Sequence, residues 1–170
     1  MTPYFAYGSN MLTARLRARV PSATPVDRAR LADHQMAWRM AGPDGSAKCD
    51  IAAAPGELVH GVLFRLTEEE LPLLDAAEGL GEGYDRETVT VTTTDGEPVA
   101  ALTYRALIHD PDRRPYDWYK GFVVAGAREH GLPADYVADL EAVTSTEDPD
   151  RDRAAANFAL QGGANSADAG

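Results

Sequence analysis

Short strand-like segments dominate the first two thirds of the chain. Their apolar or β-branched residues come in brief runs or in strict alternation, and glycine, proline and Asp-Gly turns separate them. The clearest case is the alternating stretch ETVTVTTT, which the Asp95-Gly96 turn joins to a second strand as a hairpin. The predicted strands cover residues 4–7, 30–42, 51–54, 58–66, 87–94 and 99–107.

Helical periodicity occurs between and after these strands. Ser9 or Asn10 is expected to cap a helix that follows Gly8 directly. A T-x-x-E pattern at residues 67–70 predicts a capping box for a second helix. The predicted helices run from residue 9 or 10 to Pro21, from 67 to 78, from 117 to 130 and from 133 to 143.

This order of elements predicts an α+β fold, a small mixed β-barrel or strongly curled sheet with flanking helices. Residues 1–145 are expected to form one domain. The chain then turns acidic and afterwards rich in alanine, glycine, asparagine and serine. Such a composition buries little apolar surface, so residues 146–170 are predicted to form a partly disordered tail that is frayed over 162–170.

Composition and charge narrow the function classes. The net charge of −11 disfavours binding to nucleic acid or to an anionic membrane, because both require a basic face. The single cysteine, Cys49, cannot form an internal disulfide, and the four histidines lack metal-ligand spacing. No signal peptide or membrane-spanning run is apparent, so we expect a cytoplasmic protein without a metal. The abundance of alanine, arginine, aspartate and glycine suggests a GC-rich bacterial source.

The first candidate for chemistry is the turn between the opening strand and the helix. A chain that leaves a strand at Gly8 and starts a helix at Ser9 or Asn10 presents backbone N–H groups to an anion. The alternative is that these residues only cap the helix. The turn matches neither a nucleotide-binding glycine fingerprint nor a serine nucleophile elbow.

The second candidate is Glu78, which stands at the end of a predicted helix before Gly79. The partial negative charge of a helix C-terminus disfavours an ionised carboxylate there, so it is expected to raise the pKa of the carboxyl group. A general base that works near neutral pH needs such a raised pKa. The alternative is an exposed glutamate in a poor position. Asp75, one turn earlier, is more typical of a surface residue.

Several motifs together resemble the gamma-glutamylcyclotransferases over roughly residues 4–143. The resemblance implies a small mixed barrel with flanking helices, a Y-G-S-N loop that holds the glutamyl group, and one glutamate for acid–base chemistry. The chain departs from the family pattern at Pro115-Tyr116, where Pro-Ser is common. The motifs are YFAYGSN at 4–10, LD at 74–75, EG at 78–79, Tyr84, YK at 119–120 and GAREHGLP at 126–133.

By position, the resemblance makes Glu78 the catalytic acid/base. The substrate-binding residues that it implies are Tyr4, Tyr7, Gly8, Ser9, Asn10 and Tyr119. The implied reaction converts a gamma-glutamyl amide into 5-oxoproline and a free amine, and it needs no cofactor.

Other interpretations stay open at this point. One is a binding module of the same fold without turnover, and another is a hydrolase in which Glu78 activates water. The leaving amine is also open: an amino acid, a polyamine, an ε-lysyl group or a protected biosynthetic intermediate. The expected partner is a small gamma-glutamyl compound, and a homodimer is an open possibility.

Overall fold

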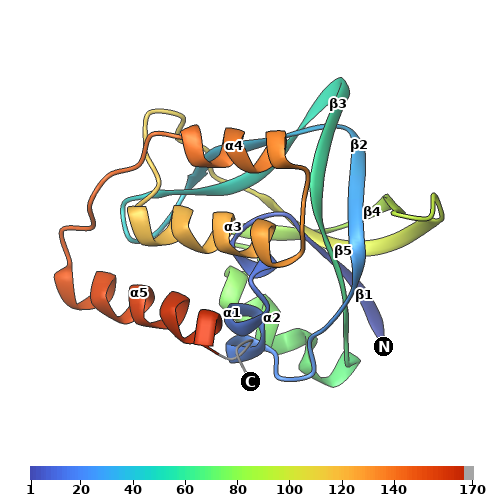
Figure 1. Ribbon diagram of the computed structural model, residues 1–170, viewed down its shortest axis with the longest axis horizontal. Coiled ribbons are helices and arrows are strands. Elements are labelled where there is room, and N and C mark those ends of the chain that lie inside the picture. Colours follow the sequence, from blue (N-terminus) through green and yellow to red (C-terminus); the bar gives the residue numbers. More distant parts are fainter. Residues whose placement is uncertain (167–170) are drawn as a thin grey trace.

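The computed structural model describes residues 1–166, with side chains to residue 162. Within this range the strands form one closed barrel in the order β1-β3-β2-β4-β5 (Figure 1). Neighbouring strands are antiparallel except β1 and β5, whose parallel pairing closes the barrel. The predicted mixed α+β barrel is therefore confirmed. The strands are β1 (Thr2–Ala6), β2 (Thr24–Ala41), β3 (Ala47–Leu66), β4 (Tyr84–Thr93) and β5 (Pro98–Ala106).

Helices cover one side of the barrel, and the hairpin of β4 and β5 extends away from them (Figure 1). No helix within the described residues is long and apolar enough to cross a membrane. The α-helices are α1 (Thr13–Arg19), α2 (Leu71–Glu78), α3 (Asp117–Glu129), α4 (Ala134–Ala142) and α5 (Arg151–Ser166), and the short 3₁₀ helices are η1 (Ser9–Met11) and η2 (Glu68–Glu70).

Strand β3 is longer than the sequence predicts. The predicted strands 51–54 and 58–66 are parts of one strand, because Pro55 and Gly56 form an irregularity inside it and do not end it. Gly56 has a φ of 84°, and its N–H donates to the Asp33 carboxylate on β2 at 2.9 Å. Such a bulge lets a strand continue across a proline and a glycine.

The predicted side-chain caps are not formed. After Gly8 the chain makes the single turn η1, becomes extended at Leu12 with a ψ of 112°, and only then enters α1. Neither Ser9 nor Asn10 caps a helix, because both side chains are engaged elsewhere. In the expected capping box, Glu70 accepts a hydrogen bond from the Ser22 N–H at 2.8 Å, outside its own helix.

The segment after residue 145 contains the helix α5. The buried carboxylate of Asp148 binds Arg153 of α5 and the indole N–H of Trp118 on α3, and Gln161 donates to the Trp118 carbonyl at 2.6 Å. These contacts hold α5 against α3, where the sequence suggested a partly disordered tail. The domain boundary at residue 145 stays a prediction, and residues 167–170 lie outside the described range.

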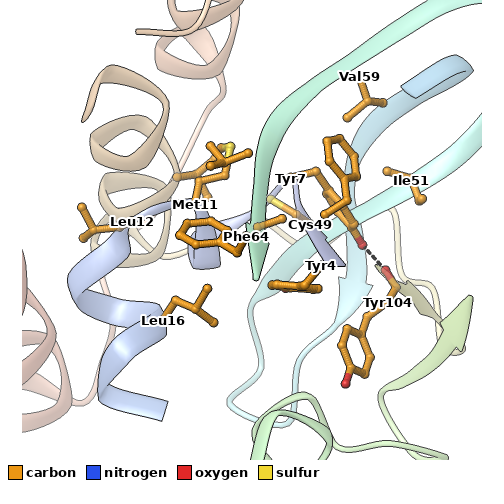
Figure 2. Packing of buried hydrophobic residues seen from close by; sticks show 14 of the residues in the cluster. Tyr4, Tyr7, Met11, Leu12, Leu16, Cys49, Ile51, Val59, Phe64 and Tyr104 are labelled. Carbon is orange, nitrogen blue, oxygen red and sulfur yellow. Dashed lines mark hydrogen bonds between the residues drawn. The ribbon is translucent and has the colours of Figure 1, made fainter. Parts of the chain in front are cut away.

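A buried cluster joins the barrel to the turn η1 and helix α1 (Figure 2). Met11, Leu16 and Phe64 are fully buried in it, and each such side chain contributes about 1.5–3 kcal/mol. Helix α3 comes very close to this turn at Gly126. A Cβ atom there would lie 2.4 Å from the backbone nitrogen of Leu12. The glycine therefore allows α3 to press the turn against the barrel.

Candidate functional site

A small inner cavity opens at the end of β1, and its volume is about 30 Å³. Elements distant in sequence meet there: β1, the Gly8–Asn10 loop, the end of α2, and single residues of β3, β4, β5 and α3. All of the predicted site residues line it. The lining residues are Tyr4, Tyr7, Gly8, Ser9, Asn10, Cys49, Glu78, Tyr84, Tyr104 and Tyr119.

The Gly8–Asn10 loop is tightly packed. Ser9 and Asn10 are buried, and a Cβ atom on Gly8 would lie 3.0 Å from the Cβ of Cys49. No hydrogen bond from the backbone N–H groups of residues 8–10 to another described residue is found. The sequence predicted that an α-helix starts in this loop. That prediction is wrong, because α1 begins only at Thr13. An anion bound here would be held by these N–H groups and less by a helix dipole.

Glu78 reaches this loop from the last residue of α2. Gly79 ends the helix in the left-handed region, as predicted, with a φ of 65°. The Glu78 carboxylate accepts hydrogen bonds from Asn10 Nδ2 at 2.8 Å and from Arg19 Nη1 at 3.1 Å. Asn10 Nδ2 also donates to the Tyr4 hydroxyl at 3.0 Å. Glu78 is thus a half-buried carboxylate held by an amide and a cation.

Tyrosines form most of the remaining wall. The Tyr7 hydroxyl donates to the Tyr104 carbonyl at 2.5 Å, an interaction visible in Figure 2. The Tyr84 hydroxyl donates to the Cys49 carbonyl at 2.6 Å, and the Tyr119 hydroxyl accepts from the Cys49 N–H at 3.0 Å. Burial raises the pKa of the hydroxyls of Tyr7, Tyr84, Tyr104 and Tyr119, which keeps them neutral, and raises the pKa of the Cys49 thiol to about 12.

Two tyrosines that the sequence left unassigned take different places. Tyr84 lines the inner cavity, so the glycine-rich segment before it brings its ring into the site. Tyr116 is outside, and its hydroxyl donates to the Asp44 carbonyl at 2.9 Å. The departure from the family pattern at Pro115-Tyr116 therefore lies outside the inner cavity.

A larger outer groove of about 560 Å³ shares Ser9, Glu78, Tyr84 and Tyr119 with the inner cavity. It also has apolar and cationic walls. Burial lowers the pKa of Arg15 to about 10 and lowers that of Lys48. Further charged and apolar residues that line the groove are Arg19, Met40, Pro43, Glu82, Ile108 and Trp118.

Sequence analysis did not identify the two arginines of the site. Arg15 and Arg19 both fall inside the helix predicted from residue 9 or 10 to Pro21, near the end where cations are favourable. Their i,i+4 spacing puts both on one face of α1, and from there Arg15 Nε donates to Ser9 Oγ at 3.1 Å. This spacing, directly after the Gly8–Asn10 loop, was the sequence signal that could have identified the two arginines as site residues. Among the described residues, no three histidine, cysteine or carboxylate side chains are grouped to hold a metal.

Comparisons with known proteins identify relatives of this chain. Residues 58–140 match the AIG2-like family. The chain is 34% identical over 148 residues to a gamma-glutamylcyclotransferase from Bos taurus, covering 82% of this chain and 77% of the relative. The corresponding Homo sapiens protein is 34% identical over 146 residues, with the same coverage. A solved gamma-glutamyl cyclotransferase structure superposes with a TM-score of 0.81 at 30% identity, covering 85% of this chain and 89% of the other.

These relatives contradict one prediction. The composition suggested a bacterial source, but the curated relatives come from cattle, mouse and human. Amino-acid bias reflects genome composition, which differs among organisms of one lineage and recurs in others. The predicted bacterial source is therefore wrong on the evidence of these relatives.

Proposed function

This chain belongs to the gamma-glutamylcyclotransferase family, and from that premise we propose that it converts a small gamma-glutamyl amide into 5-oxoproline and a free amine. One observation carries the proposal: Glu78 lies in a single cavity with the Gly8–Asn10 loop, and its carboxylate accepts a hydrogen bond from Asn10. The cavity thus combines a carboxylate for proton transfer with backbone donors for an anion.

The reaction is an intramolecular acyl transfer. The glutamyl α-nitrogen forms a bond to the γ-carbonyl carbon, and the bond from that carbon to the leaving nitrogen breaks. The α-ammonium loses two protons overall, and the leaving nitrogen gains two and departs as an ammonium. No other reactant is consumed. Because nucleophile and electrophile belong to one molecule, holding them in the reactive geometry provides much of the acceleration.

Each group of the site has a part in this scheme. Glu78 takes a proton from the α-ammonium and returns one to the leaving nitrogen. The free N–H groups of residues 8–10 bind the α-carboxylate or the developing oxyanion. Tyr4, Tyr7 and Tyr119 surround the glutamyl chain. The inner cavity alone holds only a few atoms, so the leaving amine extends into the outer groove.

Release of 5-oxoproline, measured by mass spectrometry over a panel of gamma-glutamyl amides, tests the proposal. We expect product from the wild type and very little from Glu78→Gln, with Glu69→Gln, an exposed glutamate that lines neither cavity, as the matched control. Free glutamate in place of 5-oxoproline would identify a hydrolase. Ligand binding without product, unchanged in Glu78→Gln, would identify a binding module.

The partner in this proposal is a small gamma-glutamyl compound. The homodimer and the cytoplasmic location stay predictions.

A further inference from the structure

The two oxygens of the Glu78 carboxylate have different surroundings. Oε1 accepts both hydrogen bonds, from Asn10 and from Arg19. Among the described residues, no donor forms a hydrogen bond with Oε2. The Glu78 side chain is 13% exposed and lines both the inner cavity and the outer groove. Oε2 is therefore the oxygen that remains for a ligand.

Arg19 also fixes the direction of the Asn10 amide. Its Nη1 donates to Asn10 Oδ1 at 3.0 Å, as well as to Glu78. A guanidinium can only donate, so the amide oxygen must face Arg19 and the amide nitrogen must face Glu78 and Tyr4. One nitrogen of Arg19 thus organises both hydrogen bonds that Glu78 Oε1 receives.

Arg19 is also the cation in direct contact with Glu78. Arg15, one turn earlier on α1, acts on Glu78 at longer range, and its Nε is directed to Ser9. Asp75, one turn before Glu78 on α2, is paired with Arg86.

The tyrosine hydroxyls around Glu78 stay uncharged in the pH range of an enzyme assay. Burial raises the pKa of each tyrosine hydroxyl that faces the inner cavity. In the outer groove Glu82 is a further carboxylate, and Lys48 is paired with Asp44 at 2.6 Å. The charge next to Glu78 is therefore set mainly by Arg19.

We propose that Arg19 is a positioning residue of this reaction: it holds the Glu78 carboxylate through Oε1 and leaves Oε2 free to take the proton of the substrate α-ammonium. The inference rests on the proposed function. It assigns Arg19 an effect on the orientation of Glu78, beyond any effect on folding.

The experiment compares Arg19→Gln and Arg19→Lys with the wild type in kcat and KM for 5-oxoproline release. Arg17→Gln is the matched control, because Arg17 is an exposed arginine of the same helix that donates to the Ala23 carbonyl. We expect Arg19→Gln to lower kcat about 10- to 100-fold, with a smaller change in KM, because the Glu78 carboxylate loses the donor that orients it.

Arg19→Lys should restore most of kcat, because it keeps the charge and a donor. Arg17→Gln should leave kcat and KM unchanged. A kcat of Arg19→Gln equal to that of the wild type would overturn the proposal. A loss confined to KM, or to thermal stability, would overturn it as well.

A second measurement does not depend on turnover. A ¹³C NMR spectrum of labelled glutamate carboxylates, with the Glu78 signal assigned through Glu78→Gln, follows the surroundings of Glu78 directly. A changed chemical shift of that signal in Arg19→Gln, restored toward the wild-type value in Arg19→Lys, supports the proposed contact, and an unchanged signal refutes it. Absence of 5-oxoproline from the wild type would instead refute the proposed function, so the two failures are distinguishable.

Discussion

Helix α2 carries two carboxylates one turn apart, and their surroundings differ. Both oxygens of Asp75 are engaged: Oδ1 accepts from Arg86 Nε at 2.6 Å and from the Tyr104 hydroxyl at 2.7 Å, and Oδ2 accepts from Arg86 Nη2. Glu78 is held through one oxygen only. An arginine partner alone therefore does not distinguish a structural carboxylate from a reactive one. The number of oxygens left free does.

The largest expected effect on activity comes from replacing Glu78, the carboxylate with a free oxygen. Glu78→Gln keeps the size of the side chain but cannot accept a proton, so kcat for 5-oxoproline release should fall about 10²- to 10⁴-fold. Thermal unfolding checks that the variant is folded. A loss of less than tenfold in a folded protein would mean that another group transfers the proton.

A second substitution disturbs the surroundings of Glu78 indirectly, by displacing the backbone of the loop that contains Asn10. Gly126→Ala places a methyl group against the backbone of Met11 and Leu12, next to Asn10. We expect a loss of stability of up to about 3 kcal/mol and a lower kcat, because the loop must shift. Urea unfolding and steady-state kinetics measure both quantities.

Gly121→Ala on the same helix is the control for this change. A Cβ atom there meets the movable end of the Gln161 side chain, so the variant should be affected much less. Equal losses in the two variants would contradict the role given to the close approach at Gly126.

Asp148 extends the comparison to a carboxylate remote from the cavity. Its hydrogen bonds with Arg153 and Trp118 lower its pKa below the ordinary value. The stabilisation is therefore complete above about pH 4, the ordinary range of aspartate, and is lost progressively as the pH falls below it. Asp148→Asn should cost about 2 kcal/mol at pH 7 and clearly less at pH 3, as measured by urea unfolding. An equal cost at both pH values would exclude the charge as the cause.

The smallest expected effect is at Asp75. Its side chain is 16% exposed and that of Arg86 is 37% exposed, so solvent screens the pair. Asp75→Asn should lower the free energy of unfolding by about 1 kcal/mol and leave kcat close to the wild-type value. Calorimetry and the 5-oxoproline assay measure these two effects. A large drop in kcat would show that Asp75 also belongs to the reactive machinery.

Elements that depend on local pattern were predictable from the sequence. The β4–β5 hairpin, with its Asp-Gly turn, and the end of α2 at Gly79 occur where the pattern places them. Family membership and the mixed barrel are confirmed as well. The predicted strand end at Pro55-Gly56 was wrong. These residues form a bulge within β3 because the strand pairs with β2 through Asp33, and local pattern does not reveal that pairing.

The candidate site was predictable only where local motifs mark its residues. Glu78 and the loop of residues 4–10 could be named from motifs, and the structure brings them into one cavity with Tyr119; their roles stay predictions. Arg19 could not be assigned, because its function depends on where α1 begins. Local rules place a helix start at Ser9 or Asn10, but tertiary packing at Gly126 imposes η1 and moves that start to Thr13.

The parallel closure of the barrel has a consequence for biosynthesis. Strand β1 is made first, but its neighbours are β3 and β5, and the register pairs Tyr4 with Leu102. Contacts this distant in sequence form slowly. The Gly8–Asn10 loop therefore has no fixed position while the ribosome is still producing the middle of the chain. Catalytic competence should appear late in folding, so enzyme activity would report complete barrel closure more faithfully than helix content does.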